Sequence, residues 1–278
     1  MWSVISNVQR IARAATLAAV ALTAAACAHS GAATLPAAAH SYSGPLHIPA
    51  GAGRHPQAGA AGNVVDCRTW SGGATAGPGL YHDGATADDP DAALREEGIF
   101  DGYRTGLAVA KRERDRVLYV LENREVVKEA VIVHNGPATK GAGGAGWYVE
   151  SWATCDAAEF PRQMTEAQGV QLWSDRSGRP VATTTIVSSR GAEHCGWQSM
   201  TFLELRGAVY VRDPLPELRE YFAVPYRAHV PVPREAIDTG FRRNGARLWL
   251  SADRTVAYVG AVADAEAWPR TVKPLACG

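Results

Sequence analysis

Two β-hairpins stand out in the pattern of apolar and polar positions along the chain. The first lies over residues 117–127, where an apolar run turns through the polar residues 122–125 into two valines. The second lies over residues 247–258, where an apolar run turns through residues 251–254 into a further apolar stretch. Polar turns between β-branched and aromatic runs are typical of β-hairpins.

The rest of the pattern favours short strands and few helices. We expect further strands at residues 171–173, 181–188, 201–205 and 208–212. Five prolines make residues 213–234 mostly extended or irregular. The sequence therefore predicts an α+β fold dominated by antiparallel β-sheet, in two similar lobes at residues 65–165 and 166–278.

An internal duplication is the reason for expecting two similar lobes. The string REEGIFDGYR at residues 95–104 precedes the first hairpin, and REAIDTGFR at residues 234–242 precedes the second. Each half also opens with a cysteine shortly before a tryptophan and closes with a tryptophan before a cysteine. Repeated strings of this kind are typical of repeated architecture, so we interpret the folded region as two copies of one unit.

The N-terminus has the pattern of a signal peptide. Arg10 and Arg13 give a positive start, and residues 14–26 form an apolar run without charge. The run ends in three alanines, which are the small residues that a signal peptidase requires. It is too short to span ~30 Å of hydrocarbon as a helix. We therefore expect residues 1–26 to be removed on export.

Cys27 follows this run directly, and the junction resembles the lipobox of bacterial lipoproteins. The resemblance implies that Cys27 is acylated at sulfur and becomes the mature N-terminus. The sequence departs from the lipobox at Ala24, where that family usually has leucine. The alternative is ordinary cleavage, after Ala26 or after Ala28, which would release the protein without lipid.

Residues 27–64 are rich in alanine, glycine, serine, proline and histidine and have few large apolar side chains. Such a stretch buries too little surface to offset its ordering entropy. We therefore expect a disordered tether between the lipid anchor and the folded region.

Four cysteines follow Cys27, at Cys67, Cys155, Cys195 and Cys277. Four cysteines allow three pairings, and the duplication selects Cys67–Cys155 and Cys195–Cys277. Export places the chain in an oxidising compartment, where disulfides are the default. We therefore expect one disulfide to close each lobe.

The charge balance argues against nucleic acid as a partner. The chain has 28 basic and 28 acidic residues, and loss of Arg10 and Arg13 with the signal peptide leaves 26 against 28, a net charge of −2. Nucleic-acid binders are typically strongly basic. An acidic membrane would not hold the mature chain by charge either, so we expect the N-terminal acyl chains to attach it.

Catalytic and cofactor motifs give no assignment. Residues 141–146 contain a G-x-G-x-x-G string, but residues 147–150 after it read as a strand, whereas a dinucleotide loop needs a helix there. No G-x-S-x-G, S-x-x-K or H-E-x-x-H motif occurs. We therefore expect no cofactor and no metal, and we name no catalytic residue.

Exposed aromatic side chains are the remaining candidates for ligand contact. Tryptophans beside disulfides normally pack in the core, whereas exposed ones anchor partners. Trp147 and Tyr148 lie next to the glycine-rich string, so we expect these two residues to contact a ligand.

The signal, Cys27, the Ala/Gly-rich tether and the Trp- and Cys-marked domain together resemble uncharacterised exported lipoproteins of high-GC bacteria. This resemblance implies a location at the outer face of the cell membrane, and it implies no activity. We expect a non-enzymatic binding or interaction module, with an envelope protein or glycan as partner. The alternative is an extracellular hydrolase that cleaves envelope polymers through a carboxylate pair, in a cleft with a desolvated Asp or Glu.

Overall fold

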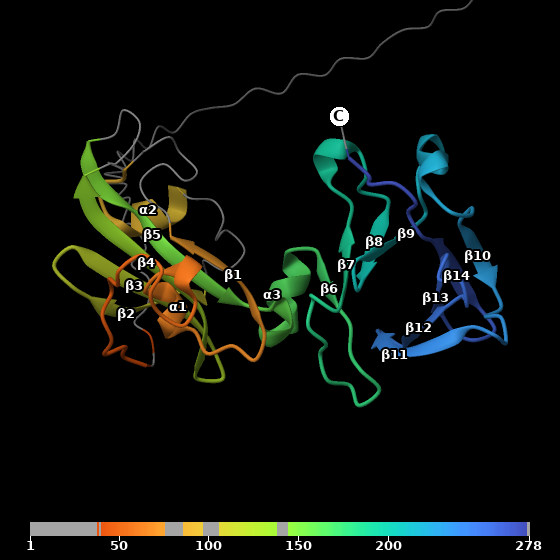
Figure 1. Cartoon of the computed structure of the whole chain (residues 1–278), viewed down its shortest axis with the longest axis horizontal. Coiled ribbons are helices and arrows are strands. Elements are labelled where there is room, and N and C mark those ends of the chain that lie inside the picture. Colours follow the sequence, from red (N-terminus) through yellow and green to blue (C-terminus); the bar gives the residue numbers. More distant parts are fainter. Residues whose placement is uncertain (1–37, 39, 76–85, 97–105, 138–143, 277–278) are drawn as a thin grey trace, which may run out of the picture. The chain divides into compact units, whose positions relative to one another are not determined.

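A computed structural model describes residues 38, 40–75, 86–96, 106–137 and 144–276. Its named strands pair in antiparallel fashion and form three sheets (Figure 1). Among the described residues the helices are short, and the longest described stretch of α-helix has seven residues. The predicted α+β class dominated by antiparallel β-sheet is confirmed. Within these ranges, the search for a helix long and apolar enough to cross a membrane finds none.

The first lobe contains a five-stranded sheet with the order β1-β5-β4-β3-β2. Its strands are β1 (Trp70–Thr75), β2 (Ala108–Arg112), β3 (Arg116–Asn123), β4 (Val126–Pro137) and β5 (Ala145–Cys155). The turn between β3 and β4 places Arg124 and Glu125 at φ angles of 53° and 65°, as a two-residue hairpin with two left-handed residues requires. The predicted hairpin over residues 117–127 is therefore confirmed.

Large side chains of β3 and β4 fill the core of the first lobe. Leu118, Tyr119 and Ile132 are fully buried. Successive strand residues point to opposite faces, so the burial of both Leu118 and Tyr119 means that both faces of the sheet are covered. The helix α2 (Pro90–Glu96) adds the buried Leu94 to this core. This two-sided cover explains why the apolar run of β3 is continuous and not alternating.

The segment before β1 packs against the first sheet. It contains the 3-10 turn η1 (Pro56–Ala58) and the short helix α1 (Ala61–Val64). Leu46 is 1% exposed and Ala58 is fully buried, and both belong to the core of the first lobe. The prediction of a disordered tether is therefore wrong for residues 46–64.

The composition that suggested disorder instead allows close packing. A Cβ atom added to Gly73 of β1 would lie 2.7 Å from the Cβ atom of Ala58, so small residues let the segment approach the backbone of the sheet. His55 also stacks on Trp70, with 3.8 Å between the ring centroids. Residues 27–37 of the expected tether lie outside the described residues.

The second lobe contains two sheets. The four-stranded sheet has the order β6-β7-β8-β9 and comprises β6 (Val170–Leu172), β7 (Ile186–Arg190), β8 (Thr201–Leu205) and β9 (Ala208–Arg212). The five-stranded sheet has the order β10-β14-β13-β12-β11 and comprises β10 (Arg227–Val230), β11 (Ile237–Arg243), β12 (Ala246–Leu250), β13 (Val256–Gly260) and β14 (Ala265–Pro269).

One core joins the two sheets of the second lobe. Its buried members come from both sheets and include Trp173, Ile186, Leu203, Leu248 and Trp268. Backbone bridges connect Ser174 with Arg242 and Tyr210 with Arg270. These contacts make the two sheets of this lobe a single packed unit.

Short helical turns connect the strands. They are η3 (Ala157–Glu159), α3 (Arg162–Ala167), η4 (Glu193–Cys195) and η5 (Pro216–Tyr221). The expected lobe boundary between residues 165 and 166 falls inside α3.

The two five-stranded sheets have the same connectivity. In each sheet the first strand along the chain pairs with the last, and the other strands follow one another as an antiparallel meander. The predicted hairpins, β3–β4 and β12–β13, hold equivalent places in the two sheets. This common topology supports two related units. The described part of the first lobe has no counterpart of the β6–β9 sheet.

The repeated strings fit this topology less well than the hairpins do. Residues 234–242 lie mostly in β11, which is itself a strand of the sheet. The strand at the equivalent place in the first sheet is β2, which follows the string at residues 95–104. Residues 97–104 of that string lie outside the described residues.

The disulfides agree with the prediction as far as the structure describes them. Cys67 and Cys155, which are 88 positions apart, form a disulfide, so the pairing of the first lobe is confirmed. Cys195 is also disulfide-bonded. Cys277 and Cys27 lie outside the described residues, so the second pairing and the lipidation stay predictions.

Candidate ligand-binding cavity

The two aromatic residues predicted to contact a ligand lie on β5. The main chain of Trp147 exchanges two hydrogen bonds with Ala87, of 2.8 and 2.9 Å, and its side chain packs against the core of the first lobe. Tyr148 is 8% exposed, and its hydroxyl group lies 2.8 Å from Nδ1 of His134. Neither residue lines the cavity of the second lobe, and their contact with a ligand stays a prediction.

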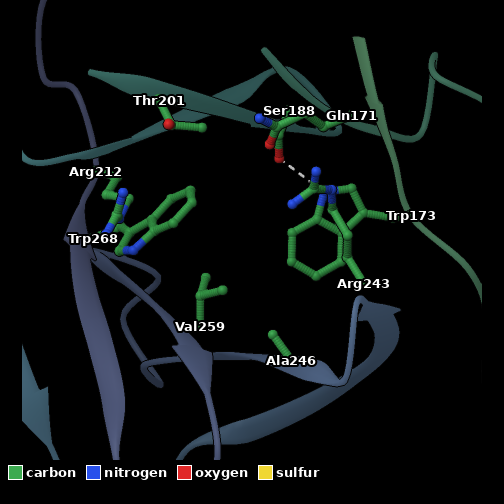
Figure 2. A pocket seen from close by; sticks show the side chains of 9 residues that line it. All are labelled: Gln171, Trp173, Ser188, Thr201, Arg212, Arg243, Ala246, Val259 and Trp268. Atoms are coloured by element: carbon green, nitrogen blue, oxygen red, sulfur yellow. Dashed lines mark hydrogen bonds between the residues drawn. The ribbon is translucent and has the colours of Figure 1, made fainter. Parts of the chain in front are cut away.

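A cavity of about 190 Å³ lies between the two sheets of the second lobe. The residues that line it are Gln171, Trp173, Ser188, Thr201, Arg212, Arg243, Ala246, Val259 and Trp268 (Figure 2). Each strand of the four-stranded sheet supplies one of them, and so does each strand of the five-stranded sheet except β10. Trp173, directly after β6, completes the set.

The walls of the cavity differ in polarity. Figure 2 shows Thr201, Ser188 and Gln171 along one wall and Val259 and Ala246 on the opposite one. A tryptophan and an arginine lie at each of the two remaining sides, which are formed by Trp268 with Arg212 and by Trp173 with Arg243. The cavity therefore has a polar wall, an apolar wall and two aromatic, cationic sides.

The polar atoms of the two tryptophans that line the cavity are already bonded. Nε1 of Trp173 donates to Oγ of Ser188 at 2.8 Å, and Nε1 of Trp268 donates to Oε2 of Glu266 at 2.8 Å. Both residues are at most 5% exposed, so neighbouring side chains hold their rings. A ligand would meet only the small exposed part of the carbon surface of these indoles, which favours apolar contact.

The charge of Arg212 is compensated. Its guanidinium group donates from Nε to Oε2 of Glu266 at 2.7 Å and from Nη2 to Oε1 at 2.8 Å. Burial acts to raise the pKa of Glu266, but hydrogen bonds from Arg212 and Trp268 outweigh it and lower the pKa. Glu266 therefore stays ionised at neutral pH and neutralises Arg212 as a bidentate partner.

Arg243 carries the uncompensated charge of the cavity. Its Nε atom is buried and has no hydrogen-bond partner, and it forms no ion pair within the described ranges. Burial lowers its pKa, the nearby Glu166 raises it and Arg162 lowers it. Arginine stays protonated at neutral pH, so a positive charge remains at the cavity without a bonded anion.

The alternation of β11 explains why Arg243 reaches the cavity while its neighbour does not. Successive strand residues point to opposite faces. Arg242 forms a bidentate pair with Asp238, with two N–O distances of 3.1 Å. Arg243 then points to the face that carries the cavity (Figure 2).

The polar wall has unused hydrogen-bonding capacity. The side chains of Gln171 and Thr201 form no hydrogen bond within the part of the chain that the structure describes. Ser188 accepts from Trp173 through its oxygen, so its hydroxyl proton remains available to an acceptor. A ligand with hydroxyl or carbonyl groups would find partners along this wall.

The desolvated carboxyl group expected for a hydrolase lies elsewhere. Glu129 on β4 is 2% exposed, and its Oε2 atom has no hydrogen-bond partner. Burial raises its pKa to about 8. Its partners in the sheet register are Leu121 and Thr154, so no second carboxylate lies directly across from it. The lining set of the cavity contains neither Asp nor Glu.

The cavity was not found from the sequence because no local motif encodes it. Its lining residues are spread from Gln171 to Trp268, mostly one to a strand. The available signal was the pair Arg242-Arg243 within a strand, since alternation must turn one of two adjacent arginines toward the packed face.

Comparisons of the chain with known protein families, with curated proteins and with solved structures found no match.

Proposed function

We propose that this protein is a binding module of the cell envelope, exported and held at the membrane by lipid on Cys27, whose second lobe binds a small anionic ligand. The observation that carries the proposal is the uncompensated guanidinium group of Arg243 at a cavity whose other cation, Arg212, is already paired. Small-molecule sites typically combine apolar and aromatic walls with a few converging polar groups.

An anion at this position would gain from both charge and geometry. Burial of an unpaired charge is costly, and a ligand carboxylate would offset that cost at Arg243. Guanidinium groups bind carboxylates through two parallel hydrogen bonds, which are stronger than bonds between neutral groups. The cavity is therefore expected to favour carboxylates over neutral molecules of the same size.

The lining favours binding over hydrolysis. Cleavage of glycosidic bonds generally needs two carboxyl groups on either side of the scissile bond, and the cavity has arginine, hydroxyl and amide groups in their place. A hydrolase site at Glu129 is the weaker alternative, because that group is packed inside the first sheet with Leu121 and Thr154 as its register partners.

The membrane part of the proposal has a direct test. The intact mass of the protein, produced in a bacterial host with its own signal, is expected to correspond to a chain that starts at Cys27 and carries acyl chains. A mass that corresponds to cleavage without lipid would contradict the anchor and leave a released binding module.

The binding part is tested with acetate as the simplest carboxylate. The indole N–H signals of Trp173 and Trp268, assigned by Trp→Phe variants, report on the cavity in ¹⁵N-labelled full-length protein in mild detergent. Acetate is expected to shift both signals in a saturable way, and Arg243→Gln to weaken this binding by about tenfold or more. Arg206→Gln removes the same charge at an exposed turn and should leave the binding unchanged. Equal binding by all three proteins would contradict the proposal.

A further inference from the structure

We infer that the ligand of the second-lobe cavity is an acidic sugar, namely a single pyranose ring that carries a carboxylate. This inference rests on the proposed function. The structure combines an unpaired guanidinium group at Arg243, two indole rings and a row of hydrogen-bonding side chains opposite an apolar wall. Each of these features matches a different part of such a ligand.

The opposed walls match the two kinds of surface on a sugar ring. A pyranose ring has hydroxyl groups that need hydrogen-bond partners and patches of C–H groups that pack on apolar surface. Gln171, Ser188 and Thr201 provide the partners on one wall, and Val259 provides apolar contact on the opposite wall (Figure 2). The ring of Trp268 lies at one side between them, and its small exposed part adds apolar contact for the C–H groups.

The charge of Arg243 matches the carboxylate. The guanidinium fork fits a planar carboxylate through two parallel hydrogen bonds. The Nε atom is shielded from solvent, so a ligand in the cavity would bond the two terminal nitrogens of the guanidinium group end-on.

The size of the cavity favours a small ligand. Its volume of about 190 Å³ lies below the ~300–1,000 Å³ of typical pockets for drug-sized ligands. We therefore expect a single sugar ring and not a polymer chain.

Two other anions fit less well. A benzoate-like aromatic acid would bond Arg243 but would leave the polar wall without partners, and unpaired buried polar groups are costly. Inorganic phosphate would meet a single uncompensated cation and an apolar wall, whereas phosphate sites typically gather several donors around the oxygens.

The test measures indole N–H shifts of Trp173 and Trp268 in full-length protein with four separate ligands: glucuronate, glucose, benzoate and acetate. Glucuronate is expected to bind at least about tenfold more tightly than glucose, because only it reaches Arg243 with a carboxylate. It should also bind more tightly than acetate, because only it reaches the polar wall. Arg243→Gln should remove the preference for glucuronate over glucose, and Arg206→Gln should keep it.

The outcomes separate this inference from the function on which it rests. Tighter binding of benzoate or acetate than of glucuronate would overturn the acidic sugar and support an anion site of another kind. No shift with any of the four ligands would overturn both. If Arg243→Gln fails to fold, Arg243→Lys keeps the charge and removes the planar fork, and an unchanged glucuronate preference in that variant would overturn the bidentate arrangement.

Discussion

Glu129 provides the sharpest prediction about stability. The side chain lies within β4, 2% exposed, with Oε2 unpartnered, and burial raises its pKa from 4.5 to about 8. The folded protein therefore binds this proton more tightly than the unfolded chain does. Stability from this group is complete below pH 4.5 and is lost as the pH rises toward 8.

The magnitude follows from linkage. Each tenfold difference in proton affinity between the two states is worth about 1.4 kcal/mol. Between pH 4.5 and pH 7.5 the pKa of about 8 lowers the free energy of unfolding by about 3–4 kcal/mol. Glu129→Gln does not titrate, so this variant should gain about 3–4 kcal/mol relative to the wild type over the same interval.

Urea unfolding at pH 4.5 and pH 7.5, followed by tryptophan fluorescence, measures this change. Glu159→Gln is the control, because the pKa of Glu159 is shifted in the opposite direction. Burial acts to raise the pKa of Glu159, but the hydrogen bond from Lys128 at 2.8 Å and main-chain N–H donors outweigh it and lower the pKa. Its variant should be less stable than the wild type at both pH values, and the deficit should disappear only as the pH falls below 4.5 through that lowered pKa. A pH-independent difference between Glu129→Gln and the wild type would contradict the raised pKa of Glu129.

Three further predictions concern the scaffold. Replacing Cys67 and Cys155 by serine should cost about 4–5 kcal/mol in the chain-entropy model for a loop of this length; urea unfolding measures it, and equal stability would contradict a structural role. Gly73→Ala should cost about 1–3 kcal/mol, because its Cβ atom would lie 2.6 Å from the main-chain oxygen of Trp152 and 2.7 Å from the Cβ atom of Ala58; an unchanged Tm would contradict the close packing of the N-terminal segment on β1. Asp156→Ala should cost about 2–4 kcal/mol, because this buried carboxylate accepts hydrogen bonds from the N–H and the hydroxyl of Thr183 and caps η3. Asp156→Asn should recover part of the lost stability. Unchanged stability of both variants would exclude a structural role for these hydrogen bonds.

The local pattern of apolar and polar residues was sufficient to predict the two hairpins and the antiparallel sheets. The hairpin at residues 117–127 is set by adjacent residues, namely an apolar run and a turn whose residues Arg124 and Glu125 adopt left-handed conformations. The Cys67–Cys155 disulfide was predicted from the repeat of cysteine and tryptophan positions. The two five-stranded sheets have equivalent strand orders, which agrees with that repeat.

The packing of residues 46–64 could not be read from composition. Large apolar side chains are the usual sign of a core, and this segment has few of them. Ala58 is nevertheless fully buried because Gly73 on the facing strand leaves room for it. That complementarity joins residues from two elements, and neither sequence segment signals it alone.

The cavity could not be predicted from the sequence for a related reason. Trp173 and Trp268 belong to the core of the second lobe, but the space between them depends on how two sheets meet. The role of Arg243 depends on a contrast with Arg212, which has Glu266 as its partner. Pairing between residues far apart in the chain decides which arginine keeps an uncompensated charge.

A crystal structure of the protein with glucuronate would show whether the second-lobe cavity binds an acidic sugar. We expect the sugar ring in this cavity, with its carboxylate within hydrogen-bond distance of the terminal nitrogens of Arg243 and its hydroxyl groups toward Ser188 and Thr201. A glucuronate molecule bound at another place while this cavity contains only water would contradict the proposed site.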